Sequence, residues 1–427
     1  MTIIYFILIL GIIVLVHELG HFLFAKLFGV YVYEFSIGMG PKIWSRKEKG
    51  KETEYSIRAL PIGGAVMLAG EEVDDDKKIP KNRKLQSKPV WQRFLIMFFG
   101  AGSNFILAIL TLFLVAMLWG APSTEPIISE VTEGYVLYDK GVRAGDEVLS
   151  IDGEKTKTID DTMLYMALAY QKSEITFGVV DKAGKNHKIE LRSILSINDN
   201  AVKSAYDVMS YLTLNNFTVE FNDGKTKKTL DVTNLVSING NDIKSVVDIS
   251  KYIYESEIVF EVRDVNGNVK MIKAMPLFDR EMNRYRFGMT FAPEREKGIL
   301  SSIRYAFVKT GSMIKQMFLT LKLLFTGQLG MNNLGGPVAI FDVVGTSQKQ
   351  GAESLLMLLV LLCINVGFIN LIPFPAFDGG RILFLVIEKI KGSPVKAETE
   401  NKIHTVGFIL LMILIVYVTI NDVLRLF

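Results

Sequence analysis

The stretch IIYFILILGIIVLVHELGHFLFAKLF, from Ile3 to Phe28, decides the fold of this chain. It is longer than the roughly 20 apolar residues that a helix needs to cross a bilayer. No basic segment precedes it, and its first positive charge, Lys26, follows the apolar run. A cleaved signal peptide carries its positive charge in front of the apolar run, so we expect this stretch to be retained as a membrane-spanning helix.

The composition agrees with a mixed membrane and water-exposed protein. Of 427 residues, 49% are hydrophobic and 22% charged, which is too apolar for an ordinary soluble enzyme and too charged for a membrane bundle alone. The formal net charge of +3 provides no basic field for nucleic acid. The single cysteine, Cys363, excludes an intrachain disulfide and a cysteine-built zinc knuckle.

Three further stretches are apolar enough to span a bilayer: Phe94 to Trp119, Ser354 to Ile372 and His404 to Ile420. The segment from Gly298 to Gly327 mixes apolar residues with several basic ones. We expect it to form an amphipathic helix on the membrane surface, because lysines inside the run disfavour a fifth span.

The distribution of charge predicts the topology. Thirteen Lys and Arg residues lie from Val30 to Arg93, and none lies from Gly120 to Glu133. The positive-inside rule therefore puts the first loop in the cytosol and both termini outside. The large polar region after the second span is then extracytosolic.

That polar region repeats itself. VLSIDGEKTKTIDD from Val148, ILSINDNAVKSAYD from Ile194 and LVSINGNDIKSVVD from Leu235 align without gaps, and each continues into a helix-like stretch and a hairpin. GVRAGDEVLSIDG from Gly141 resembles the bacterial PDZ signature. We predict two PDZ-like modules of mixed α/β structure at about residues 121–193 and 194–293, between a first membrane half (1–120) and a second one (294–427). The alternative is a β-rich spacer that binds nothing.

The sharpest chemical motif is His17-Glu18-Leu19-Gly20-His21, inside the first apolar stretch. Residues four apart stack on one face of a helix, so both imidazoles can reach one metal ion. Ionisable residues inside a membrane are costly and are functional by default. The alternative is a polar cluster that joins helices.

A catalytic zinc site usually takes three protein ligands and keeps a fourth position for water. The candidate third ligand is Asp378, at the end of NLIPFPAFDGG, which begins at Asn370 after the third span. Pro373 and Pro375 cannot continue a helix, so the backbone breaks there and can turn the carboxylate inward. Taken alone, Asp378 could equally be a turn or helix-terminus residue.

Together the two motifs resemble the site-2 protease family of intramembrane zinc metalloproteases, in particular its bacterial regulator of sigma-E protease branch. That family pairs HExxH with Asn-x-x-Pro-x-Pro-x-x-Asp-Gly, read here from Asn370 to Gly379, with Phe377 where the family usually has leucine. FSIGMGPKIW from Phe35, YSIRALPIGGAVMLAGE from Tyr55 and GGPVAIF from Gly335 also resemble family blocks in family order. The resemblance covers nearly the whole chain.

The resemblance implies roles for individual residues. His17, His21 and Asp378 would bind Zn²⁺, and Glu18 would be the general base. Asn370 would hold the substrate backbone or steady the oxyanion, although a buried asparagine often only bonds a neighbouring helix.

We also expect a β-hairpin that re-enters the membrane. TEYSIRAL from Thr53 and AVMLAGE from Ala65 flank Pro61-Ile62-Gly63-Gly64. An extended substrate could add to the hairpin's edge near Gly63 and Gly64 through main-chain hydrogen bonds. The alternative is a plain cytosolic hairpin. His187 and His404 have no partner at ligand spacing, and we expect both to be structural or exposed.

The sequence therefore predicts a multi-pass α-helical protein of the bacterial cytoplasmic membrane, with about four spans, that acts as a zinc metalloendopeptidase in regulated intramembrane proteolysis. By the resemblance, its partners are the lipid bilayer and single-pass transmembrane substrates, such as anti-sigma factors or remnant signal peptides. Peptide C-termini would bind the PDZ-like modules. The alternatives are a catalytically inactive PDZ-bearing membrane scaffold and a metal transporter, although the sequence lacks the paired broken helices of many transporters.

Overall fold

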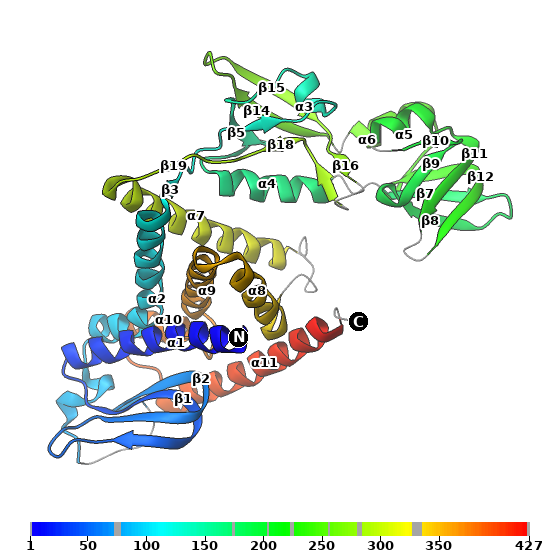
Figure 1. Cartoon of the computed structure of the whole chain (residues 1–427). Coiled ribbons are helices and arrows are strands. Elements are labelled where there is room, and N and C mark those ends of the chain that lie inside the picture. The colour runs from blue at the N-terminus through cyan, green and yellow to red at the C-terminus, as the bar shows by residue number, and fades with distance from the viewer. Residues whose placement is uncertain are drawn as a thin grey trace. The chain divides into compact units, whose positions relative to one another are not determined.

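The computed structural model describes residues 2–71, 78–172, 176–202, 205–222, 226–254, 257–279, 284–326 and 335–424. They belong to two compact units (Figure 1). The first unit combines Met1–Pro122 with Arg295–Phe427, and the second is Ser123–Glu294. The two ends of the sequence therefore build one unit, and the chain enters and leaves the middle unit through a pair of short strands, β3 (Ala121–Pro122) and β19 (Arg295–Glu296).

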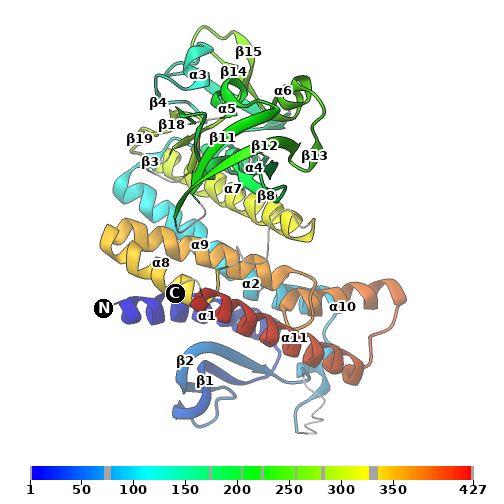
Figure 2. The same cartoon turned by 90° about the vertical axis from the view of Figure 1, so that its right-hand side faces the viewer.

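In the described part of the first unit, four helices are long and apolar enough to cross a membrane. They are α1 (Thr2–Leu27), α2 (Val90–Trp119), α9 (Ala352–Leu371) and α11 (Ala397–Leu424). Helix α2 packs against both α1 and α9 (Figure 2). Their shared core holds fully buried side chains such as Ile13, Leu112 and Cys363. The four predicted spans are thus confirmed as apolar helices of spanning length.

Three shorter or more polar helices complete this unit: α7 (Ile299–Phe325), α8 (Pro337–Gln350) and α10 (Asp378–Lys391). Helix α7 covers the segment expected to be amphipathic. Helix α8 begins with proline, whose fixed φ suits the first helical position. A carboxylate oxygen of Asp422, on α11, accepts hydrogen bonds from the N–H groups of Gly336 (2.8 Å) and Ala339 (3.1 Å) at the start of α8. These bonds satisfy N–H groups that a helix leaves free.

The loop between α1 and α2 contains two long strands, β1 (Val32–Arg46) and β2 (Glu54–Leu68), and the short 3₁₀ turns Lys81–Arg83 and Leu85–Ser87. Phe35 of β1 pairs with both Tyr55 and Val66 of β2, so β1 lies between the two halves of β2. The prediction that the segments beginning at Thr53 and Ala65 form a hairpin with each other is therefore wrong. The glycines between them lie inside β2, where Gly63 has a φ of +82°, a conformation that favours glycine.

The middle unit contains two larger sheets in its described part. The smaller has the order β15-β14-β5-β6, from β5 (Glu147–Ile151), β6 (Glu154–Lys155), β14 (Ile258–Arg263) and β15 (Val269–Ala274). The larger has the order β10-β9-β11-β12-β7-β8, with β13 on β12, from β7 (Thr176–Asp181), β8 (Asn186–Glu190), β9 (Ile194–Ile197), β10 (Asn200–Ala201), β11 (Asn215–Asn222), β12 (Lys227–Ile238) and β13 (Asn241–Asp242). Each sheet packs on its own hydrophobic core.

These pairings change the predicted division of the middle region. Strand β5 precedes the predicted boundary between residues 193 and 194, yet it pairs with β14, which follows that boundary. The boundary itself falls inside the larger sheet, between β8 and β9. The segment that forms the larger sheet is therefore inserted between the strands of the smaller sheet, because the hairpin β14–β15 pairs with β5 across it.

The threefold repeat has a common local structure. Each copy is a strand, a tight turn, a two-residue strand and a helix: β5-β6-α4 (Ile159–Lys172), β9-β10-α5 (Ala205–Tyr211) and the end of β12-β13-α6 (Val246–Tyr254). In two copies the repeated aspartate binds the loop before the helix: Asp161 accepts the N–H of Lys157 (3.1 Å), and Asp248 that of Lys244 (2.9 Å). In these two copies the repeated aspartate therefore stabilises the start of its helix.

Short elements complete the unit: α3 (Val136–Asp139), β4 (Glu130–Val131) paired with β18 (Met289–Thr290), and β16 (Leu277–Asp279) paired with β17 (Arg284–Arg286).

Candidate metal centre

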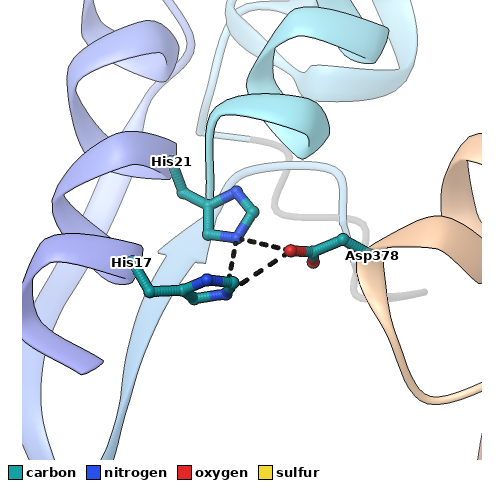
Figure 3. A group of neighbouring side chains, drawn as sticks. All are labelled: His17, His21 and Asp378. Carbon is teal, nitrogen blue, oxygen red and sulfur yellow. Dashed lines mark hydrogen bonds and ion pairs between the residues drawn. The ribbon is translucent and has the colours of Figure 1, made fainter. Parts of the chain in front are cut away.

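Helix α1 aligns the two histidines of the first motif. His17 and His21 are one turn apart, and their Nε2 atoms lie 3.3 Å from each other. Their rings are nearly perpendicular, with centroids 4.9 Å apart. Figure 3 shows both rings extending from one face of α1 towards Asp378. The helical spacing thus converges two nitrogen donors on one point, as the motif predicts.

Asp378 begins α10 and comes from the opposite end of the sequence. Its Oδ2 atom lies 3.4 Å from Nε2 of His17 and 3.3 Å from Nε2 of His21 (Figure 3). All three ligand atoms lie within 4.8 Å of one another. The structure therefore brings together the three residues that the sequence singled out as candidate ligands.

The spacing of these atoms fits a zinc ion. Ligand atoms placed tetrahedrally at about 2.0–2.1 Å from Zn²⁺ are separated from one another by about 3.3–3.4 Å. The three edges of the triangle here are 3.3, 3.3 and 3.4 Å. Oδ2 of Asp378 is also buried without a hydrogen-bond partner in the described chain. Two imidazoles and one carboxylate are a common ligand set of zinc hydrolases, and they leave the fourth position for water.

A hydrogen bond to the main chain fixes the protonation of His21. Its Nδ1 lies 2.8 Å from the carbonyl oxygen of Ile96, on α2, in a buried position. Since a carbonyl only accepts, Nδ1 carries the proton and the lone pair of Nε2 is free for a metal. Gly100, one turn further along α2, makes room for the ring, because a Cβ there would lie 2.1 Å from Nε2. Sequence reasoning missed both residues of α2.

The break predicted before Asp378 is confirmed. Helix α9 ends at Leu371 and α10 begins at Asp378. Two glycines let α10 start directly against the intervening loop: a Cβ at Gly379 would lie 2.2 Å from the carbonyl oxygen of Ile372, and one at Gly380 would lie 2.5 Å from that of Phe374. The Asp-Gly-Gly sequence therefore combines a carboxylate with two positions where the backbones come into contact.

Glu18 lies beside the sheet of the first loop. A Cβ at Gly64 would come within 2.7 Å of Cγ of Glu18 and 3.0 Å of the carbonyl oxygen of Ser36. Gly64 therefore lets β2 approach the motif helix closely. Gly63 packs instead on the side chain of Met39, with which a Cβ would overlap at 2.8 Å.

Asn370 is half-buried in the last turn of α9. Its side chain makes no hydrogen bond with the described residues. The structure thus brings Gly64 to Glu18, whereas Asn370 and Gly63 have no direct bond to the histidine and aspartate cluster.

A charged cavity near the cluster was not expected from the sequence. Its volume is about 410 Å³, and charged side chains line it: Glu71, Arg93, Arg381, Glu388 and Glu400. Arg381 forms an ion pair with Glu71, and Arg93 forms one with Glu388. Arg381 lies one turn after Asp378 on α10, so the first pair joins α10 to the turn that follows β2. Isolated charges flanking apolar runs were the only sequence signal for these pairs.

A bundle of spanning-length helices that holds a His, His and Asp cluster beside a glutamate defines a membrane-embedded metallohydrolase. The family model described as peptidase family M50 matches residues 5–414. The chain therefore belongs to peptidase family M50, the site-2 protease family, and is an intramembrane zinc metalloprotease.

Full-length relatives agree with this assignment. The regulator of sigma-W protease RasP of Bacillus subtilis is 30% identical over 503 residues, which cover 100% of this chain and 99% of that protein. The regulator of sigma E protease of Haemophilus influenzae is 30% identical over 453 residues, covering 99% and 98%. The zinc metalloprotease RasP of Bacillus licheniformis is 28% identical over 503 residues, covering 100% and 99%.

Proposed function

We propose that this metalloprotease cleaves single-pass transmembrane proteins within or near the bilayer, with His17, His21 and Asp378 as zinc ligands and Glu18 as general base. The observation that carries the proposal is the triangle of ligand atoms, whose edges of 3.3–3.4 Å match tetrahedral zinc. It is built from two segments at opposite ends of the chain.

The chemistry divides between the ion and the protein. Bound zinc lowers the pKa of water to about 7 and polarises a peptide carbonyl. Glu18, adjacent to the ligand His17, takes a proton from the attacking water and later gives it to the leaving amine. The Ile96 carbonyl keeps His21 in the tautomer that presents Nε2.

The substrate must be extended at the point of cleavage, because a helix screens its own peptide groups. The segment of β2 from Ala65 to Leu68 pairs with β1 on one side. Its other edge, which continues from Gly64 beside Glu18, can pair with an extended substrate through main-chain hydrogen bonds. Gly64 adds no side chain to this approach beside Glu18, Gly63 precedes it on the same strand, and the Asn370 amide holds the substrate backbone or the oxyanion.

The topology and the middle unit complete the proposal. The positive-inside rule puts both termini and Ser123–Glu294 outside the cytosol, in the bacterial cytoplasmic membrane. The two sheets of this unit act as PDZ-like modules that exclude substrates with bulky outer domains or bind freshly exposed C-termini. The names of the relatives as regulators of sigma-W and sigma-E support anti-sigma factors as substrates, with remnant signal peptides as a second class.

Co-expression of a tagged single-pass protein with a short outer tail tests the proposal. We expect wild-type protein to release a fragment and Glu18→Gln to release none while retaining one zinc ion per chain. Glu398→Gln, at an exposed position of α11, is the matched control and should cleave normally. Equal cleavage by wild type and Glu18→Gln would refute the role of Glu18 and favour an inactive scaffold accompanied by another protease.

A further inference from the structure

Helix α11 reaches the loop that leads into Asp378. Nδ1 of His404, near the start of α11, accepts a hydrogen bond from the backbone N–H of Ala376, with a separation of 3.1 Å. Ala376 lies two residues before Asp378. His404 is therefore bonded to the backbone that aims the proposed third ligand, although its spacing in the sequence gave it no partner.

The backbone at Ala376 is strained. Its φ is +95°, in the region that favours glycine. In the described part of the chain the other non-glycine residues with positive φ are all asparagine or aspartate, whose side chains stabilise this conformation locally: Asp152, Asn198, Asp199, Asn216 and Asn239. An alanine has no such side chain, so surrounding groups must hold it in place.

Those surrounding groups come from α11 and α10. Gly407, one turn after His404, lets α11 lie directly on the loop, because a Cβ there would be 2.4 Å from the carbonyl oxygen of Pro375. The ring of Phe384, on α10, lies against the ring of His404 with centroids 5.7 Å apart. In the described structure, contacts from α11 and α10 thus support the hydrogen bond that the Ala376 N–H donates to His404.

The bond also fixes the state of His404. An N–H only donates, so Nδ1 must be the nitrogen without a proton, and the proton is on Nε2. Nε2 is buried and has no hydrogen-bond partner among the described residues. Among the described residues, the hydrogen bond at Nδ1 is thus the one that the His404 side chain makes.

We propose that His404 is a positioning residue that holds Ala376 in its strained conformation and thereby directs the carboxylate of Asp378 towards His17 and His21. The inference rests on the proposed function, because the proposed function assigns Asp378 as a zinc ligand. His404 acts through the loop and does not itself touch the reacting atoms.

The test uses the full-length protein in detergent and four variants. His404→Leu removes the acceptor, and His404→Gln offers an amide oxygen in its place. Ala376→Gly removes the strain, and the fourth variant combines it with His404→Leu. Zinc retained after dialysis against a chelator is measured beside kcat and KM for a tagged substrate, and Thr405→Val, on the exposed side of α11, is the control.

We expect His404→Leu to weaken zinc retention and kcat by about tenfold or more with little change in KM, as is typical of lost support around a metal ligand. His404→Gln should restore part of both. In the Ala376→Gly background the effect of His404→Leu should fall below about threefold, because glycine needs no bond to hold its positive φ. A general loss of folding would instead be equal in both backgrounds.

The inference is overturned if His404→Leu retains zinc and kcat at the wild-type level, or if its effect is unchanged by Ala376→Gly. Failure of the proposed function has a different signature: wild-type protein would then hold no zinc, or Glu18→Gln would still cleave.

Discussion

The substitution Gly100→Ala tests the geometry of the metal centre most directly, because it changes no candidate ligand. The added Cβ would lie 2.1 Å from Nε2 and 2.3 Å from Cε1 of His21. Non-bonded heavy atoms are comfortable at about 3.5 Å, so the imidazole must move by about 1.4 Å. Zinc–ligand distances tolerate deviations of only about 0.2 Å. The required movement is several times larger, so His21 can no longer share an ion with His17 and Asp378.

Zinc affinity is therefore expected to fall at least 100-fold, beyond the 10–100-fold effect of disturbing a residue behind the ligands. Competition with a chromophoric chelator measures this in purified protein, and cleavage of a tagged substrate should fall in parallel. Overpacking adds a cost of about 1–3 kcal/mol to folding, which thermal unfolding reports separately.

Gly11→Ala on α1 is the matched control, because a Cβ there meets nothing within 4 Å. It should leave zinc affinity unchanged and favour the helix by about 0.5–1 kcal/mol. Zinc affinity and cleavage within twofold of wild type for Gly100→Ala would refute the position of the His21 ring, and with it the proposed ligand triangle.

Three further outcomes are expected. Arg381→Glu should lower thermal stability and cleavage by placing two carboxylates together, and adding Glu71→Arg should recover much of both, with a coupling energy of about 0.5–3 kcal/mol in a double-mutant cycle. Asp422→Ala should destabilise the first unit by about 1–3 kcal/mol in thermal unfolding, because two N–H groups at the start of α8 lose their acceptor. Hydrogen bonds from Asn268 to Asp264 hold the pKa of that carboxyl below its usual 3.8. The carboxylate therefore stabilises the β14–β15 turn above pH 3.8, and this stabilisation is lost as the pH falls through the lowered pKa. Amide hydrogen exchange at the turn, corrected for the intrinsic exchange rate, should detect the loss.

Each of these outcomes has a control or a contradicting result. If the double charge reversal is no better than Arg381→Glu alone, the ion pair does not join the two segments. Asp342→Ala, at an exposed position of α8, should leave thermal unfolding unchanged, and a loss equal to that of Asp422→Ala would contradict the capping role. Asp264→Asn should remove the acid-dependent exchange at the turn, and exchange that still rises at the same pH in this variant would assign the effect to another group.

Most of the metal centre could be predicted because its rules are local. The helical period alone places His17 and His21 on one face, and the prolines before Asp378 end one helix before another begins. The assignment of Asp378 as the third candidate ligand needed the family resemblance, since Asp-Gly by itself is also a common turn. The structure then brought the three together.

The parts that could not be predicted depend on contacts between distant segments. Two such contacts are the space that Gly100 leaves for His21 and the hydrogen bond from Ala376 to His404. Both follow from how helices pack, and the hydrophobic periodicity of the sequence does not predict them. His404 was expected to be structural or exposed, and its partner is a backbone group with no sequence signature. Helix propensity and hydrophobic pattern say which faces are buried, and they leave open which atoms meet.

The predicted strand pairings were wrong for the same reason: they depend on contacts between distant segments. Each copy of the repeat was expected to continue into its own hairpin, within the module that contains the copy. The observed sheet instead pairs β14 with β5 across an inserted sheet. In the first loop, the segments beginning at Thr53 and Ala65 resemble the arms of a hairpin, but β1 lies between them. Alternation of residues identifies strands without identifying their neighbours.

The ligand triangle has a consequence for the biogenesis of the protein. Ribosomes deliver α1 first, so the histidine pair enters the membrane long before Asp378 is synthesised. On the proposed ligand set, a growing chain carries only two of the three donors until Asp378 has been synthesised behind α9. The proposed ligand set therefore predicts that a chain interrupted before Asp378 cannot hydrolyse peptides.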